Sequence, residues 1–234
     1  MAGNILHSDG EELGRGFILI AALIGLAAGA CVYGIDAAFL ENTTDDAPPL
    51  ALTALTAVSH GALACLLILS TRAPLRSVGL SAAIALALAG PSYFLFHEEA
   101  ASKMLSNFPF SFWFFLAAPV AFFVLTTFAK TFLEDTGGAG DRRFAYRTIF
   151  FHGLTTPLIA AGATFIAVLA FLLLTAWAAL LRSLDVEIFS VIIEKKWFIF
   201  PFFAMITAIS IALMRRQNAV LGALRFLLLL FSRI

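Results

Sequence analysis

The residues that could do chemistry in this chain form only incomplete motifs. His97, Glu98 and Glu99 begin like the zinc-binding helix of a metalloprotease, but Ala101 stands where the second histidine would follow. The stretch Gly79–Ala83 begins like a hydrolase nucleophile elbow, but its second glycine is missing and no strand pattern precedes it. We therefore expect no catalytic residue, metal ion or cofactor, and a non-enzymatic role is favoured. Chemistry on lipid or peptide stays open only if residues beyond Ile234 complete a site.

His60 is the one ionisable side chain that we expect near the middle of an apolar segment. It lies about 15 Å into the stretch that begins at Leu50. Ionisable groups in hydrocarbon cost at least a few kcal/mol unless they are paired or hydrated. The favoured interpretation is a neutral imidazole hydrogen-bonded to a neighbouring helix. The alternative is a proton or ligand site in a polar cavity, with Thr53, Thr56 and Ser59 beside it.

The two cysteines, Cys31 and Cys65, are expected to lie at different depths in the membrane. Their distances from the inner ends of their segments differ by about 13 Å, whereas the Cα atoms of a disulfide lie within about 7 Å. We therefore predict two buried free thiols.

Six long apolar stretches must position any such group, and they predict an all-α, polytopic transmembrane helix bundle. Hydrophobic residues make up 61% of the 234 residues, charged residues 13%, and the mean hydropathy is +0.96. Each stretch is about 27 to 38 Å long as a helix, against a hydrocarbon core of about 30 Å. A seventh stretch, Val220–Ile234, is a partial or complete span. The six are Phe17–Leu40, Leu50–Ser70, Val78–Phe96, Phe110–Leu133, Pro157–Leu181 and Trp197–Met214.

The division of basic residues between alternate connectors predicts the orientation. One set of segments carries nine cations: Arg15, Arg72, Arg76, Lys130, Arg142, Arg143, Arg147, Arg215 and Arg216. The other set carries Lys103, Arg182, Lys195 and Lys196. We therefore expect residues 1–16 to be a cytoplasmic tail, with residues 17–133 holding four helices and residues 157–234 the remaining ones in a single domain.

The connector of residues 134–156 is predicted to hold an interfacial helix on the cytoplasmic side. Asp141 can cap a segment in which cations alternate with aromatic and aliphatic residues. Thr156 followed by Pro157 is typical of a helix start, so we expect the interfacial helix to break from the next span there. The candidate contacts to lipid headgroups are Arg142, Arg143, Arg147 and His152.

Two further features concern packing and the opposite membrane surface. Residues 182–196 are too apolar for a solvated loop, and we predict a second interfacial amphipathic helix between Trp177 and Trp197. Ala21, Gly25 and Gly29 recur every four residues and would let another helix approach closely, either within the chain or in a second copy.

From Tyr146 to Arg233 the chain resembles the bacterial multi-pass membrane proteins of domain of unknown function family 4153. The ordered features are an aromatic segment, a span ending in Thr175–Leu181, the element Leu184–Phe189, the run Trp197–Pro201 and a span closing on Arg215 and Arg216. The resemblance implies a bacterial inner-membrane protein, and it carries over no catalytic residue. Members are typically longer, so it also implies that the chain is a fragment.

These features favour a membrane component that binds lipid or a protein partner, including a second copy of the chain. The alternative is a transporter or permease-like protein whose pathway passes His60. No phosphate-binding glycine loop and no basic surface predicts nucleic-acid binding.

Overall fold

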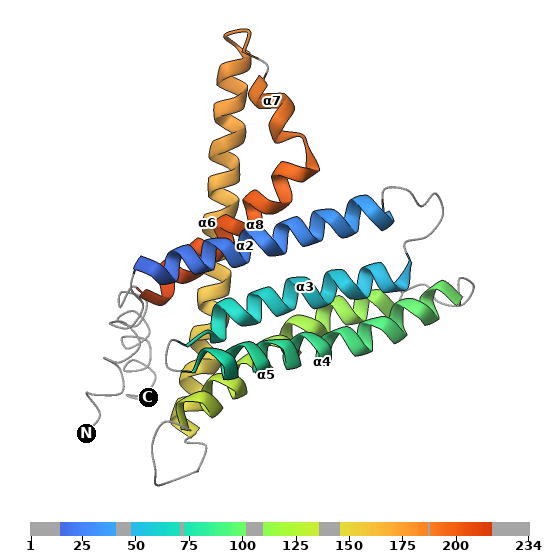
Figure 1. The fold of residues 1–234 in the computed structure, drawn as a ribbon, viewed down its shortest axis with the longest axis vertical. Helices are drawn as coiled ribbons and strands as arrows, with labels where there is room; N and C mark the ends of the chain where they lie inside the picture. The colour runs from blue at the N-terminus through green and yellow to red at the C-terminus, as the bar shows by residue number, and fades with distance from the viewer. Residues whose placement is uncertain are drawn as a thin grey trace, which may run out of the picture. The chain divides into compact units, whose positions relative to one another are not determined.

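The computed structural model describes residues 15–40, 48–70, 73–101, 110–135, 146–186 and 188–216 (Figure 1). Helices and the short turns beside them account for these residues, which confirms the predicted all-α class. The elements are α2 (Arg15–Ile35), the π-helix η1 (Asp36–Leu40), α3 (Pro49–Ile68), α4 (Pro74–Ala101), α5 (Phe110–Asp135), α6 (Tyr146–Arg182), α7 (Ile188–Ile193) and α8 (Lys196–Arg216). The predicted seventh span, Val220–Ile234, lies outside the described residues.

Six helices in the described part of the chain are long and apolar enough to cross a membrane. Many of their large apolar side chains point away from the protein: Leu86 is 71% exposed and Phe165 is 64% exposed. Such surfaces are unfavourable in water and favourable in hydrocarbon, where the helix also satisfies every backbone polar group of the segment. The chain is therefore a multi-pass helical membrane protein.

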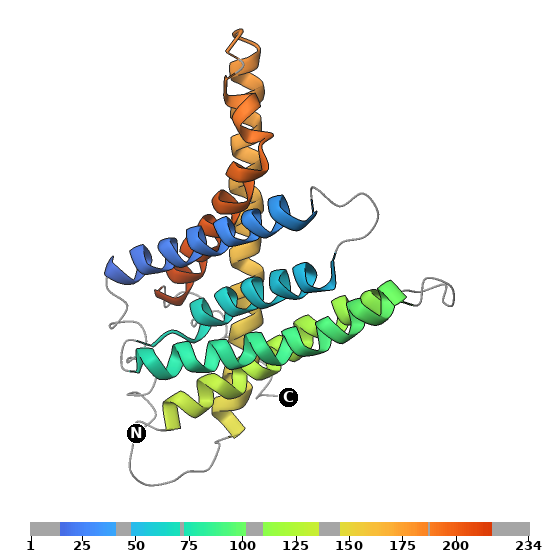
Figure 2. The same cartoon turned by 45° about the vertical axis from the view of Figure 1, so that its right-hand side comes forward.

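The described residues within 27–153 form one compact unit, whose framework is α3, α4 and α5. The three helices lie side by side (Figures 1 and 2). Gly61 of α3 leaves room for Ala85 of α4, whose Cβ lies 3.1 Å from the position that a Gly61 Cβ would take. At the α3–α4 turn, the Ser70 backbone N–H donates to Ser77 Oγ at 3.1 Å. At the opposite end, which we call the Pro49 end, Phe96 of α4 packs edge to face against Phe114 of α5.

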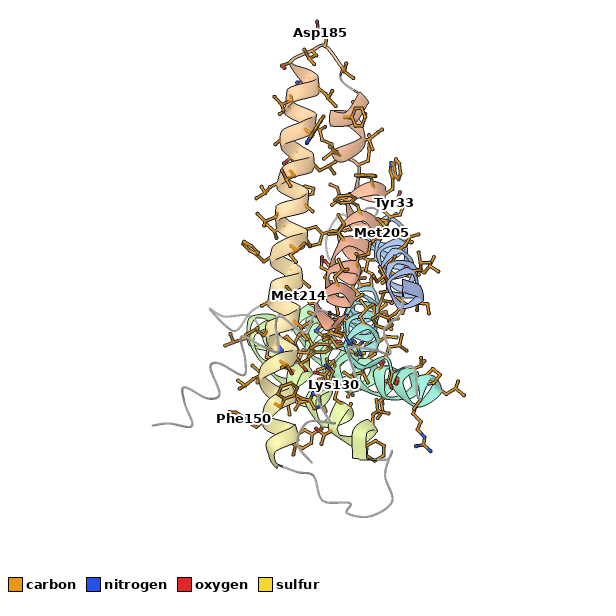
Figure 3. All side chains as sticks on the ribbon, turned by 90° about the vertical axis from the view of Figure 1, so that its left-hand side faces the viewer. Tyr33, Lys130, Phe150, Asp185, Met205 and Met214 are labelled. Atoms are coloured by element: carbon orange, nitrogen blue, oxygen red, sulfur yellow. The ribbon has the colours of Figure 1, made fainter. Side chains whose placement is uncertain are left out.

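The second unit comprises the described residues within 1–26 and 154–234, and α8 is the helix that its neighbours share. Phe171 of α6 packs against Phe203 of α8, with ring centroids 6.4 Å apart. Gly162 of α6 lies against the end of the Met214 side chain of α8 (Figure 3). The Arg215 guanidinium lies 5.1 Å from the centre of the Phe17 ring, a cation–π contact between α8 and α2.

Gly25 brings α2 against the backbone of α8. A Cβ at Gly25 would lie 2.6 Å from the Ala204 carbonyl oxygen, 2.6 Å from Ala208 Cβ and 2.9 Å from Met205 Cα. Ala21, Gly25 and Gly29 are all buried, although only the contacts of Gly25 identify α8 as the neighbour. In lipid, close backbone approach of this kind supplies the dispersion energy that holds helices together.

The predicted break at Pro157 is wrong, because α6 is one continuous helix of 37 residues. Proline removes only one intrahelical bond, the one that would end on the Gly153 carbonyl, so the hydrogen bonds on either side of it remain. Thr156 is fully buried within the helix rather than acting as a cap at its start. Membrane helices tolerate such prolines when the remaining bonds and the neighbouring helices compensate.

The expectation of two buried thiols is also wrong in part. Cys31 is exposed and Cys65 is half-buried, although neither forms a disulfide, as predicted. Cys31 lies on the exposed side of α2. Because α2 is apolar on all sides, its sequence does not show which side is covered by protein.

Replacing Gly25 with alanine should destabilise the protein, because the added methyl group would meet the rigid backbone of α8. We expect a cost of about 1 to 3 kcal/mol, typical of overpacking, and a lower midpoint in detergent thermal unfolding followed by size-exclusion chromatography. Gly34→Ala in the same helix is the control, since nothing lies within 4 Å of its Cβ position. Equal midpoints for the two variants would contradict the tight contact.

Candidate functional site at His60

His60 lies near the middle of α3, and its imidazole forms a hydrogen bond within that helix. Its Nδ1 is 2.9 Å from the Thr56 carbonyl oxygen. A carbonyl only accepts, so Nδ1 carries the proton and Nε2 is the acceptor of the neutral ring. We expected a hydrogen bond from His60 to a neighbouring helix, but the bond is to Thr56 of α3 itself. The neighbouring helix α5 supplies a ring contact instead.

Phe122 of α5 forms the other side of this site. Its ring meets the half-buried His60 imidazole edge to face, with centroids 5.5 Å apart and planes at 65°. Phe122 is only 1% exposed and is the largest fully buried side chain of the described residues. The contact places the imidazole between its own helix and α5.

The hydroxyls beside His60 also bond to their own helix. Thr53 donates to the Pro49 carbonyl at 2.8 Å, Thr56 to the Leu52 carbonyl at 2.9 Å and Ser59 to the Leu55 carbonyl at 2.6 Å. Because these donations use the hydroxyl protons, the oxygen atoms retain only acceptor capacity. Together with Nε2, they can accept hydrogen bonds from a ligand that carries donors.

Of the four predicted contacts to lipid headgroups, the structure describes Arg147 and His152. Arg142 and Arg143 lie outside the described residues, and Arg147 belongs to the first turns of α6. His152 is only 5% exposed, so its ring is enclosed by protein rather than offered to a lipid headgroup. Its place on the buried side of α6 decides this, and a mixed polar and aromatic sequence cannot distinguish the two sides.

A buried row of hydroxyls was not predicted. It lies near the start of α4 and the end of α5, away from the Pro49 end. Each hydroxyl donates to a carbonyl three or four residues earlier in its own helix, so the row needs no partner on another helix. The sequence signal was the spacing of four residues within two pairs, Ser77 with Ser81 and Thr127 with Thr131. The row consists of Ser77, Ser81, Thr126, Thr127 and Thr131.

Phe122→Ala should destabilise the protein by about 3 kcal/mol, because it opens a cavity at a fully buried position and removes the wall behind His60. The thermal midpoint in detergent should fall by several degrees. Phe132→Ala in the same helix is the matched control, since Phe132 is 48% exposed and its removal leaves no enclosed cavity. A loss of stability no larger than that of the control would show that Phe122 does not support the site.

The described residues offer no cluster of metal-ligating side chains. Within the described ranges, no three His, Cys, Asp or Glu residues lie close enough to hold a metal ion together. The His60 site is therefore characterised by its acceptor geometry. No family model, curated protein or solved structure matches the chain.

Proposed function

We propose that this protein is a non-enzymatic component of a bacterial inner membrane that binds a lipid or protein partner. One observation carries the proposal: the row of buried hydroxyls in α4 and α5 is bonded to carbonyls three or four residues earlier in the chain, as in Ser81 to the Ser77 carbonyl and Thr131 to the Thr127 carbonyl. These hydroxyls suit helix packing, because each one donates its hydrogen bond without a bound substrate. The large apolar side chains point outward, where lipid or a membrane partner can cover them.

Two segments are the places where we expect a partner to bind. The first is the basic stretch that begins at Arg142 and runs into the first turn of α6, without the enclosed His152. The second surrounds α7, where Phe189 and Val191 are exposed between the exposed Trp177 and Trp197. Tryptophan and exposed apolar side chains of this kind favour the layer between hydrocarbon and headgroups.

The observation that favours transport as the second candidate is the position of His60. A half-buried imidazole in the middle of a membrane-spanning helix, with a free acceptor and three acceptor hydroxyls along the same helix, could bind a proton or a donor-bearing solute. In this alternative, the pathway follows the face of α3 that carries Thr56 and His60.

The proposed orientation has a cytoplasmic amino terminus. The basic residues near the helix ends, including Arg76 in the first turn of α4 and Arg216 at the end of α8, support it. The resemblance of Tyr146–Arg233 to domain of unknown function family 4153 supports the bacterial inner membrane as the location.

Alkaline phosphatase fused after Asp46 should be active, and the same enzyme fused after Arg216 should be inactive. The reverse pattern would overturn the orientation.

Extraction with native lipids followed by mass spectrometry tests the main proposal. We expect a protein present in a fixed ratio, or one lipid class enriched over the bulk membrane. A retained soluble metabolite would instead favour the transport alternative.

His60→Leu separates the two candidates. If the protein is a binding component, the variant should keep its bound partner and have an unchanged or higher thermal midpoint, because the substitution removes a polar group from hydrocarbon. The matched control is Leu50→Ala, which alters a 70% exposed side chain of α3 that is not one of the acceptors around His60. Loss of a bound metabolite in the His60 variant alone, without loss of stability, would establish the transport alternative.

A further inference from the structure

Pro91 of α4 and Pro119 of α5 lie at the same depth in their unit, although they are far apart in the sequence. The two helices run antiparallel and are aligned by the contact of Phe96 with Phe114, whose ring centroids are 6.0 Å apart. Counting the same number of residues away from each phenylalanine, toward the middle of its helix, reaches Pro91 and Pro119. The contacts of Gly61 with Ala85 and of His60 with Phe122 give the same alignment to within about one helical turn.

Each proline removes one backbone hydrogen bond and crowds the carbonyl four residues earlier. The affected carbonyls are those of Ala87 in α4 and Phe115 in α5. Bending is therefore easiest at these two places, and helix kinks concentrate at proline. Both proline side chains are exposed, so they do not separate the two helices. Because the weak points lie at one depth, the two helix ends beyond them can tilt together.

A cluster of buried side chains joins these ends into one body. Phe96, Phe114 and Ala118 are 7%, 9% and 4% exposed, and we call them the aromatic cap. Leu95 packs against the aromatic cap from α4, and Leu52 packs against it from α3. Leu52 is thus the α3 residue through which the cap rests on the third helix of the unit.

Leu52 also begins the row of side chains that leads to His60. Leu52, Thr56 and His60 are spaced four residues apart, so they follow one another along one face of α3. Thr56 and His60 offer hydrogen-bond acceptors along this face. At the Pro49 end of the face, Leu52 is in contact with the aromatic cap.

We propose that the aromatic cap is a lid that pivots on Pro91 and Pro119 and controls access from the Pro49 end to the acceptor row at His60. The lid closes on Leu52, and its tilting uncovers a route for a proton or a small donor-bearing solute. This inference rests on the transport alternative for its ligand, but the motion of the lid is testable without any ligand.

The test is the distance between spin labels on the lid and on α3, measured by electron paramagnetic resonance in lipid nanodiscs. In a Cys31→Ser, Cys65→Ser background, Leu50→Cys and Phe94→Cys carry the labels, since both side chains are 70% exposed and flank the cap contact. We expect two distance populations. Pro91→Ala with Pro119→Ala should reduce the minor population about tenfold, as two restored backbone hydrogen bonds would.

Two controls make the result specific. Labels at Ser59→Cys and Leu86→Cys connect the same two helices on the other side of the prolines, and should show one narrow population with or without the prolines. Pro201→Ala in α8 removes a helix-interior proline elsewhere and should leave both populations of the lid pair unchanged. A single population in the parent protein, or two that persist in the double proline variant, would overturn the lid. His60→Leu tests the transport function separately, because it leaves both prolines in place.

Discussion

The constraint on which the structure depends is that polar groups in hydrocarbon must find hydrogen bonds within the protein. An unsatisfied backbone group costs several kcal/mol where no water can reach it, so each span must be a helix. The side chains follow the same rule. Thr126 and Thr127 bond to carbonyls of their own helix, and the His60 imidazole does so through Nδ1. The hydroxyls of Thr126 and Thr127 therefore donate their hydrogen bonds in hydrocarbon without depending on a neighbouring helix.

Once hydrogen bonding is complete within each helix, close packing is what remains to hold helices together. Lipid tails are as apolar as leucine, so burial by itself favours no particular neighbour. The residues at the close contacts are consequently small. Gly25 admits the α8 backbone, Gly61 admits Ala85 and Gly162 admits the Met214 side chain. These three contacts differ in how well they would tolerate an added methyl group, because a backbone cannot move aside as a flexible methionine side chain can.

The prolines illustrate how one residue type acquires different roles from its surroundings. Pro157 lies inside a continuous α6, beside buried threonines. Pro91 and Pro119 lie in two paired helices at matching depth, so both helices bend most easily at the same level. The missing hydrogen bond is identical in each case, and its consequence depends on which helices lie alongside.

The sequence by itself determined the all-α class and the six apolar helices, because segment length and hydropathy are local properties that the bilayer constraint converts directly into helices. It also singled out His60 and the small-residue row at Gly25. Only the tertiary structure decided that Phe122 lies against His60, that Gly25 faces α8, that His152 is buried and that α6 continues through Pro157. The physical reason is that apolar segments surrounded by lipid lack a strong inside-to-outside pattern, so the direction of each side chain is set by the neighbouring helices.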